Sequence, residues 1–77
     1  MKLRVGILGP GAIGGLIAGL FWKAGYDVFC VGRHSSVSVI NEEGLHIESP
    51  VFGDFVAYPK ADIKLTVPVD ILFITLK

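Results

Sequence analysis

The chain opens with a short apolar run, a turn rich in glycine, and a segment with helical spacing. The run covers residues 3–8 and is nearly unbroken, which is typical of a strand buried in a parallel sheet. Apolar residues then recur at intervals of three and four, at Ile13, Leu16, Ile17, Leu20 and Ala24. This spacing predicts a helix that ends at Gly25, since glycine favours C-terminal caps. A second apolar run at 28–31 completes a strand–helix–strand unit, whose crossover is expected to be right-handed.

The next part of the chain has a weaker pattern. A short helix is predicted from Ser35 or Ser36, acting as its N-cap, to Glu43, with Gly44 ending it. Alternating valines in the same stretch also fit a strand. Both interpretations therefore remain open at this point.

Two short alternating segments, 45–48 and 55–58, predict a pair of strands joined by a turn. Residues 59–68 are predicted to be mainly loop. A third continuous apolar run at 71–76 follows Asp70 and predicts another buried strand. A hairpin-like excursion is therefore expected between the second and third strands of a parallel sheet.

The glycine-rich turn reads G-x-G-x-x-G, directly after a predicted strand and at the start of a predicted helix. In this context Gly9 permits the tight turn, Gly11 lets the backbone approach a pyrophosphate, and Gly14 allows close packing of helix on strand. The helix N-terminus adds free N–H groups for the anion. The residues expected to contact the cofactor are Gly9, Pro10, Gly11, Ala12, Ile13 and Gly14. Gly15 and Gly19 are predicted to be packing residues.

These features predict an α/β fold, a Rossmann-type parallel sheet with a βαβ start and a β-hairpin excursion. A doubly wound dinucleotide-binding domain normally has two such halves. The sequence stops at Lys77, so residues 1–77 are expected to be the N-terminal part of such a domain, an incomplete first half.

The choice of dinucleotide depends on the end of the second strand. An NAD site usually has an acidic residue there, about 20 residues after the glycines. Here the chain has Arg33, whose planar guanidinium suits a 2′-phosphate, and Asp27 lies at the wrong end of the strand. The sequence therefore predicts NADPH rather than NADH. His34, Ser35 and Ser36 are further candidates for the same phosphate, and Lys77, just past the third strand, is a candidate cleft residue.

Composition narrows the function classes. Seven basic residues balance seven acidic ones, which argues against nucleic acid bound by bulk electrostatics. Hydrophobic residues make up 52%, a share that suggests part of a larger core. The single cysteine, Cys30, excludes an intrachain disulfide, fits a cytoplasmic protein, and is expected to be buried and inert. His34 and His46 lack partners at metal-ligand spacing, so no metal is predicted.

A membrane segment is the main competing interpretation of the first part of the chain. Residues 5–22 carry no charge and precede Lys23, as a spanning helix could. The repeated glycines and Pro10 argue against it, because proline breaks a helix. We therefore expect no membrane association.

Several segments together resemble the ketopantoate reductase (2-dehydropantoate 2-reductase) family. They are Met1 to Gly19, Val31-Gly32-Arg33, Ile40-Asn41-Glu42-Glu43-Gly44-Leu45, and Asp70 to Lys77. Pro10 is a minor departure, since alanine is more usual there. The resemblance implies NADPH-dependent reduction of ketopantoate to pantoate, towards pantothenate and coenzyme A, by a Rossmann-type domain and a helical C-terminal domain with the active site between them.

By this resemblance Gly9, Gly11 and Gly14 match the pyrophosphate loop, Arg33 the 2′-phosphate contact, and Lys77 a lysine near the cofactor and substrate cleft. The principal catalytic lysine and the substrate-binding acid of the family lie in a part this chain lacks, so the 77 residues alone are expected to be inactive. The expected partners are a 2-keto acid and, for a homodimer, a second copy. A non-catalytic dinucleotide-binding module and a different reductase with the same N-terminal half remain alternatives.

Overall fold

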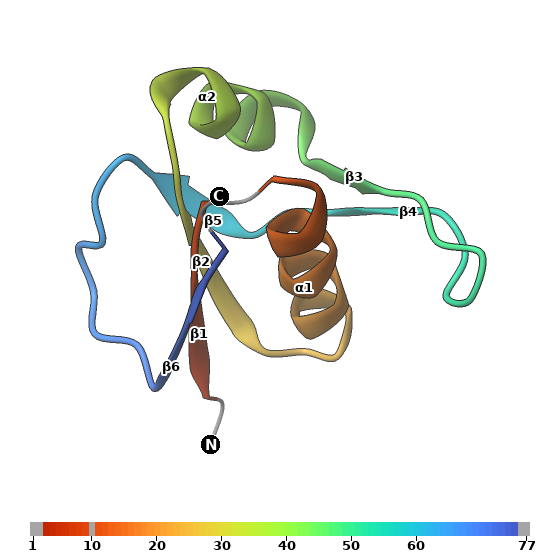
Figure 1. The fold of residues 1–77 in the computed structure, drawn as a ribbon, viewed down its shortest axis with the longest axis horizontal. Coiled ribbons are helices and arrows are strands. Elements are labelled where there is room, and N and C mark those ends of the chain that lie inside the picture. The colour runs from red at the N-terminus through yellow and green to blue at the C-terminus, as the bar shows by residue number, and fades with distance from the viewer. Residues whose placement is uncertain (1–2, 10, 76–77) are drawn as a thin grey trace.

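A four-stranded parallel sheet in the order β5-β2-β1-β6 forms the centre of the computed structural model, which describes residues 3–9 and 11–75 (Figure 1). Its strands are β1 (Arg4–Leu8), β2 (Asp27–Val31), β5 (Lys60–Asp62) and β6 (Ile71–Ile74). The helices are α1 (Ala12–Lys23) and α2 (His34–Glu43). The antiparallel hairpin consists of β3 (Leu45–Ile47) and β4 (Phe55–Ala57). The predicted α/β class, the βαβ start and the hairpin are confirmed.

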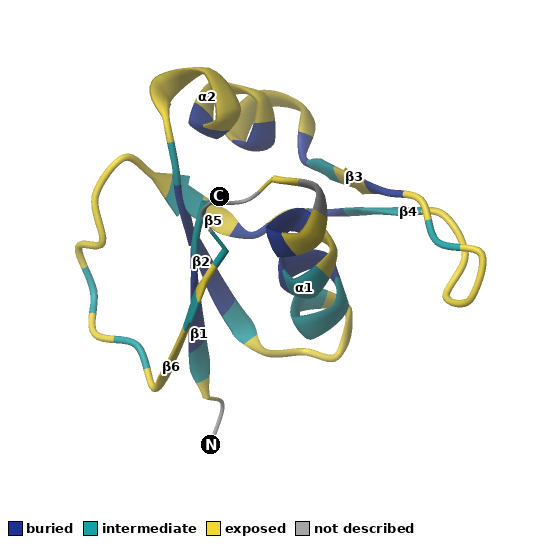
Figure 2. Ribbon diagram, in the orientation of Figure 1, coloured by how far each residue is buried: buried dark blue, intermediate teal, exposed yellow. Residues whose placement is uncertain are grey.

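One face of the sheet carries the core. The register pairs Val5 with Val28 and Ile7 with Cys30, so these four side chains share a face. They form one buried cluster with Ala18 of α1 and Ile40 of α2. Both helices therefore contribute to the core on this face, and Figure 2 shows the buried residues concentrated along β1, β2 and α1. The long segment 63–70 passes on the other side of the strands from α1 (Figure 1).

Helix α1 ends as the sequence predicts. Gly25 has a φ of 94°, which an L side chain rarely adopts. Its N–H donates to the Trp22 carbonyl at 3.0 Å, and the next N–H, of Tyr26, donates to the Phe21 carbonyl at 3.1 Å. This pair of bonds is a Schellman motif, which satisfies two carbonyls that the helix leaves without partners.

The start of α2 differs from the prediction. The helix begins at His34 with Arg33 as its N-cap, so the assignment of Ser35 or Ser36 as the cap is wrong. The Val37 N–H donates to the Arg33 carbonyl at 2.9 Å, which closes the first turn without any side-chain cap. The strand interpretation is also wrong, because Val37 and Ile40 are buried at helical spacing. Gly44 ends the helix as expected, with a φ of 83°.

The predicted loop 59–68 contains a strand that the sequence does not reveal. β5 pairs in parallel with β2, with Cys30 opposite Ala61. Lys60 and Asp62 flank Ala61 and are exposed, so the strand has no apolar run or apolar alternation to identify it. Its position next to β2 was therefore set by pairing rather than by local pattern.

The third apolar run forms a strand that is less buried than predicted. β6 pairs with β1, but Ile71, Leu72 and Ile74 are 40%, 43% and 66% exposed. Phe73 is the side chain that reaches the core, with its ring 5.6 Å from that of Phe21. β6 is an edge strand, so within the residues that the structure describes no further strand pairs with its outer edge. The predicted strand end at Leu76 lies outside the described residues.

The hairpin packs on α1, and small residues make this possible. A Cβ on Gly19 would lie 2.5 Å from side-chain carbons of Ile47, and one on Gly15 would lie 3.5 Å from Leu45 Cδ1. The prediction of a packing glycine is confirmed at Gly19, whereas a Cβ on Gly15 would make only an ordinary contact. The uncharged stretch 5–22 is divided between β1 and α1, and among the described residues no helix is long and apolar enough to cross a bilayer.

Candidate cofactor-binding edge

The carboxyl ends of β1 and β2 lie side by side, and the glycine turn starts there. Gly9 follows β1 with a φ of 82°, a conformation that favours glycine. Its N–H donates to the carbonyl of Val31, the last residue of β2, at 2.9 Å. The turn is thus fastened to the neighbouring strand. In open α/β sheets ligands bind outside this edge.

Gly11 is the N-cap of α1 and faces open space. A Cβ at this position would meet nothing within 4 Å among the described atoms, and the first turn of α1 contains no acidic residue and no side-chain cap. The first N–H groups of a helix have no intrahelical partners, and they carry partial positive charge. The N-terminus of α1 is therefore open to an anion, as the motif predicts.

Gly14 lies in the first turns of α1 against the end of β6. A Cβ there would overlap Thr75 Oγ1 and would lie 2.7 Å from the Gly9 carbonyl oxygen. Close packing thus requires glycine at this position, as predicted, although the nearest atom belongs to a side chain at the end of β6. Thr75 is a residue of this edge that the sequence reasoning missed. Thr75 is the one polar residue within the predicted run 71–76, and this was the signal that could have identified it.

Arg33 stands at the end of β2 and at the start of α2. Its side chain is exposed, and it makes no hydrogen bond or ion pair with residues 3–9 or 11–75. His34, Ser35 and Ser36 follow in the exposed first turn of α2, which contains no acidic residue. A second helix N-terminus and a guanidinium therefore lie on the same edge as the glycine turn, as the sequence predicts.

The structure says less about the other residues that the sequence singles out. Ile13 is 73% exposed at the start of α1. Pro10 and Lys77 lie outside the described residues, as does the side chain of Ala12. Cys30 is buried as expected, and burial raises the pKa of its thiol to about 11. Such a thiol is protonated at neutral pH, which fits a packing role.

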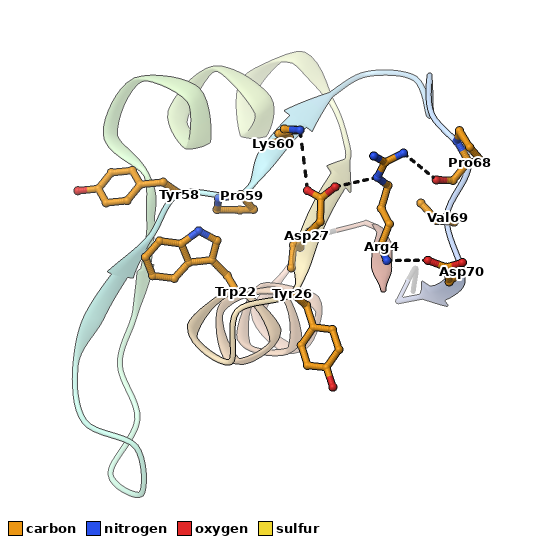
Figure 3. A pocket seen from close by; sticks show the side chains of 11 residues that line it. Arg4, Trp22, Tyr26, Asp27, Tyr58, Pro59, Lys60, Pro68, Val69 and Asp70 are labelled. Atoms are coloured by element: carbon orange, nitrogen blue, oxygen red, sulfur yellow. Dashed lines mark hydrogen bonds and ion pairs between the residues drawn. The ribbon is translucent and has the colours of Figure 1, made fainter. Parts of the chain in front are cut away.

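A cavity of about 540 Å³ lies at the opposite edge, where the parallel strands begin (Figure 3). Arg4 Nε donates to Asp27 Oδ2 at 2.8 Å, and Lys60 Nζ lies 3.9 Å from Asp27 Oδ1. The Arg4 guanidinium also donates to the Pro68 carbonyl at 3.2 Å. The backbone N–H of Arg4 donates to Asp70 Oδ2 at 2.7 Å. These bonds join the starts of the strands. Asp27 therefore lies at the edge remote from the glycine turn, which confirms that it cannot serve as the ribose-binding acid.

The parallel sheet and the glycine turn at its carboxyl edge are those of the start of a Rossmann-type α/β domain. Residues 5–77 match the family described as ketopantoate reductase PanE/ApbA, and the chain belongs to this family. Curated relatives include the 2-dehydropantoate 2-reductases of Pyrococcus abyssi (53% identical over 45 residues) and Pyrococcus horikoshii (46% over 46 residues). These alignments cover 58% and 60% of this chain and 15% of each relative.

Solved structures agree in fold. A probable 2-dehydropantoate 2-reductase, panE, from Bacillus subtilis superposes with a TM-score of 0.82 at 29% identity, over 96% of this chain and 25% of that chain. The 2-dehydropantoate 2-reductase from Methylococcus capsulatus superposes with a TM-score of 0.81 at 29% identity, over 94% and 24%. The chain thus spans about a quarter of the solved chains that it matches.

Proposed function

We propose that this chain forms the phosphate-binding part of an NADPH-dependent reductase that converts a 2-keto acid, ketopantoate in the first instance, to the 2-hydroxy acid. The observation that supports this most is the shared edge of the glycine turn and Arg33. The start of α1, directly after the turn, offers N–H groups that have no intrahelical partners, and Arg33 offers an exposed guanidinium without a partner among the described residues. The choice of ketopantoate as substrate is taken from the relatives, which are named 2-dehydropantoate 2-reductases.

The residues present fit NADPH in two respects. Gly11 leaves space that a side chain would fill, so backbone can approach a pyrophosphate. Arg33 lies at the end of β2, where an NAD site would have an acid, and its planar fork suits the 2′-phosphate. When bound, NADPH would supply the hydride for reduction. The described residues of this chain would hold and orient the adenosine and pyrophosphate end.

The reaction itself belongs to the whole protein, since this chain spans about a quarter of the solved reductases that it matches. The residues that bind the keto acid are expected outside the described part, with Lys77 as the nearest candidate. A non-catalytic dinucleotide-binding module is the alternative. It would bind NADPH without oxidising it in the presence of any 2-keto acid.

Arg33→Ala in the full-length protein tests the cofactor assignment. Removing a charge-assisted phosphate contact costs about 1.5–3 kcal/mol, or about 10- to 150-fold. We expect the KM for NADPH to rise by that factor while the KM for NADH changes little. Steady-state kinetics with both cofactors and ketopantoate provide the measurement.

Lys60→Met is the matched control, because it also removes one positive charge but at the opposite edge of the sheet. It should leave both KM values unchanged. Equal changes of the two KM values in Arg33→Ala would remove the 2′-phosphate assignment. Absence of turnover with every 2-keto acid, with NADPH binding retained, would favour the non-catalytic alternative.

A further inference from the structure

Thr75 joins the end of β6 to the glycine turn through both its backbone and its side chain. Its N–H donates to the Leu8 carbonyl at 2.9 Å, continuing the ladder between β1 and β6. Its hydroxyl lies 2.5 Å from the Gly9 carbonyl oxygen and 3.0 Å from that of Leu8. A threonine hydroxyl has one proton to donate, and the shorter contact is the one to Gly9.

The Gly9 carbonyl thereby has two donors. Gly11 N–H donates to it at 2.8 Å across the turn, and the Thr75 hydroxyl donates from β6. A carbonyl oxygen has two lone pairs, so these bonds use its full accepting capacity. At the other side of the same residue, the Gly9 N–H is bound to Val31. The peptide groups on both sides of Gly9 are therefore fixed, one by β2 and the other by β6.

This arrangement matters for an anion. A carbonyl oxygen turned towards a phosphate would repel it, whereas N–H groups attract it. Thr75 holds the Gly9 carbonyl against the sheet, which leaves the N–H groups at the start of α1 for the ligand. The same hydroxyl oxygen occupies the space that a side chain on Gly14 would need. One side chain thus sets both the orientation of the turn and the closeness of α1.

We propose that Thr75 is a positioning residue for the cofactor pyrophosphate, acting through the Gly9 carbonyl. This inference rests on the proposed function, since it assumes that the turn binds a dinucleotide. Thr75 does not touch the ligand in this role. Its hydroxyl, rather than its methyl group, carries the effect.

The test uses Thr75→Val and Thr75→Ser in the full-length protein, with binding measured by titration of NADPH and of 2′-AMP. Valine keeps the shape and removes the hydroxyl, so the Kd for NADPH should rise about tenfold, the upper range for one hydrogen bond. Serine keeps the hydroxyl and should bind NADPH within about twofold of wild type. The Kd for 2′-AMP, which has no pyrophosphate, should be unchanged in both. Thr66→Val, in the exposed segment 63–70, is the matched control.

If the valine variant fails to fold, Thr75→Ala against Thr75→Ser isolates the hydroxyl in the same way. NADPH affinity that is equal in the hydroxyl-free variants and wild type would overturn the inference. So would a parallel loss of NADPH and 2′-AMP binding, which indicates general damage. A wild-type protein that binds neither ligand refutes the proposed function itself, a result distinct from either of these.

Discussion

The glycines of the turn and of α1 have different reasons to be glycine. At Gly9 the reason is a positive φ, and at Gly14 it is the lack of space beside Thr75 and the Gly9 carbonyl. Gly15 has only an ordinary contact, since its nearest side-chain atom, Leu45 Cδ1, would lie 3.5 Å from a Cβ. Neighbouring positions in one helix should therefore respond to alanine in opposite directions.

Gly14→Ala should lower the free energy of unfolding by about 2 kcal/mol, because the added methyl group overlaps its neighbours and forces a shift. Gly15→Ala should be neutral or stabilise by about 0.5–1 kcal/mol, since alanine is the better helix former. Urea denaturation followed by circular dichroism measures both. Equal effects in the two variants would contradict the contact geometry at Gly14.

Sequence reasoning at the residue scale identified the glycines and Arg33 because each lies within a local motif. It missed Thr75, which contacts the turn across 66 residues of chain. No local spacing relates Thr75 to Gly9. The connection exists because β6 pairs with β1 in a register that places Ile74 opposite Leu8.

At the scale of elements, the starts of the strands are tied together by one side chain. Arg4 of β1 binds Asp27 of β2 and the Pro68 carbonyl that precedes β6 (Figure 3). Lys60 of β5 is a weaker member, since its Nζ is 3.9 Å from Asp27 and its side chain is 70% exposed. The cluster thus offers a strong and a weak ion pair around one carboxylate.

Arg4→Met should reduce the free energy of unfolding by about 1 kcal/mol, because it removes the bond to the partly buried Asp27 carboxylate and a bond to a carbonyl. Lys60→Met should change it by less than about 0.5 kcal/mol, as is usual for exposed ion pairs. Thermal unfolding at low and high salt measures the two effects. A larger loss from Lys60→Met would invert this ranking.

The positions of strands and helices with an apolar pattern were predicted correctly, whereas β5, which has no such pattern, was predicted as loop. The buried strands β1 and β2 and the helix α1 correspond to the clear runs and spacing of the first 31 residues. β5 has a lysine and an aspartate on either side of one alanine, and its pairing with β2 provides the evidence that it is a strand. The start of α2 was misplaced because serines are common caps, whereas here the chain turns directly after β2.

For the whole molecule, the main feature is a sheet with an exposed apolar edge. Ile71, Leu72 and Ile74 of β6 are all at least 40% exposed. Exposed edge strands with apolar side chains pair readily with other chains. Part of the hydrophobic content that the sequence shows therefore lies exposed on this edge strand.

The chain of 77 residues should therefore self-associate in solution through β6. Analytical ultracentrifugation should show a weight-average mass that rises with concentration. Ile74→Lys places a charge on this edge and should shift the distribution towards the monomer. Val39→Lys, on an exposed position of α2, is the control and should leave the association as it is. Monomeric wild type at all concentrations would refute this interpretation of the edge.

The glycine motif, the apolar runs and Arg33 were sufficient for the fold class and the candidate phosphate edge. The glycine motif, the apolar runs and the charge of Arg33 are local features of the chain, so the sequence alone reveals them. The tertiary structure decided that β5 is a strand, that Arg4 joins the starts of the sheet, and that Thr75 holds the glycine turn. Each of these depends on strand pairing and register, which bring together residues far apart in the chain.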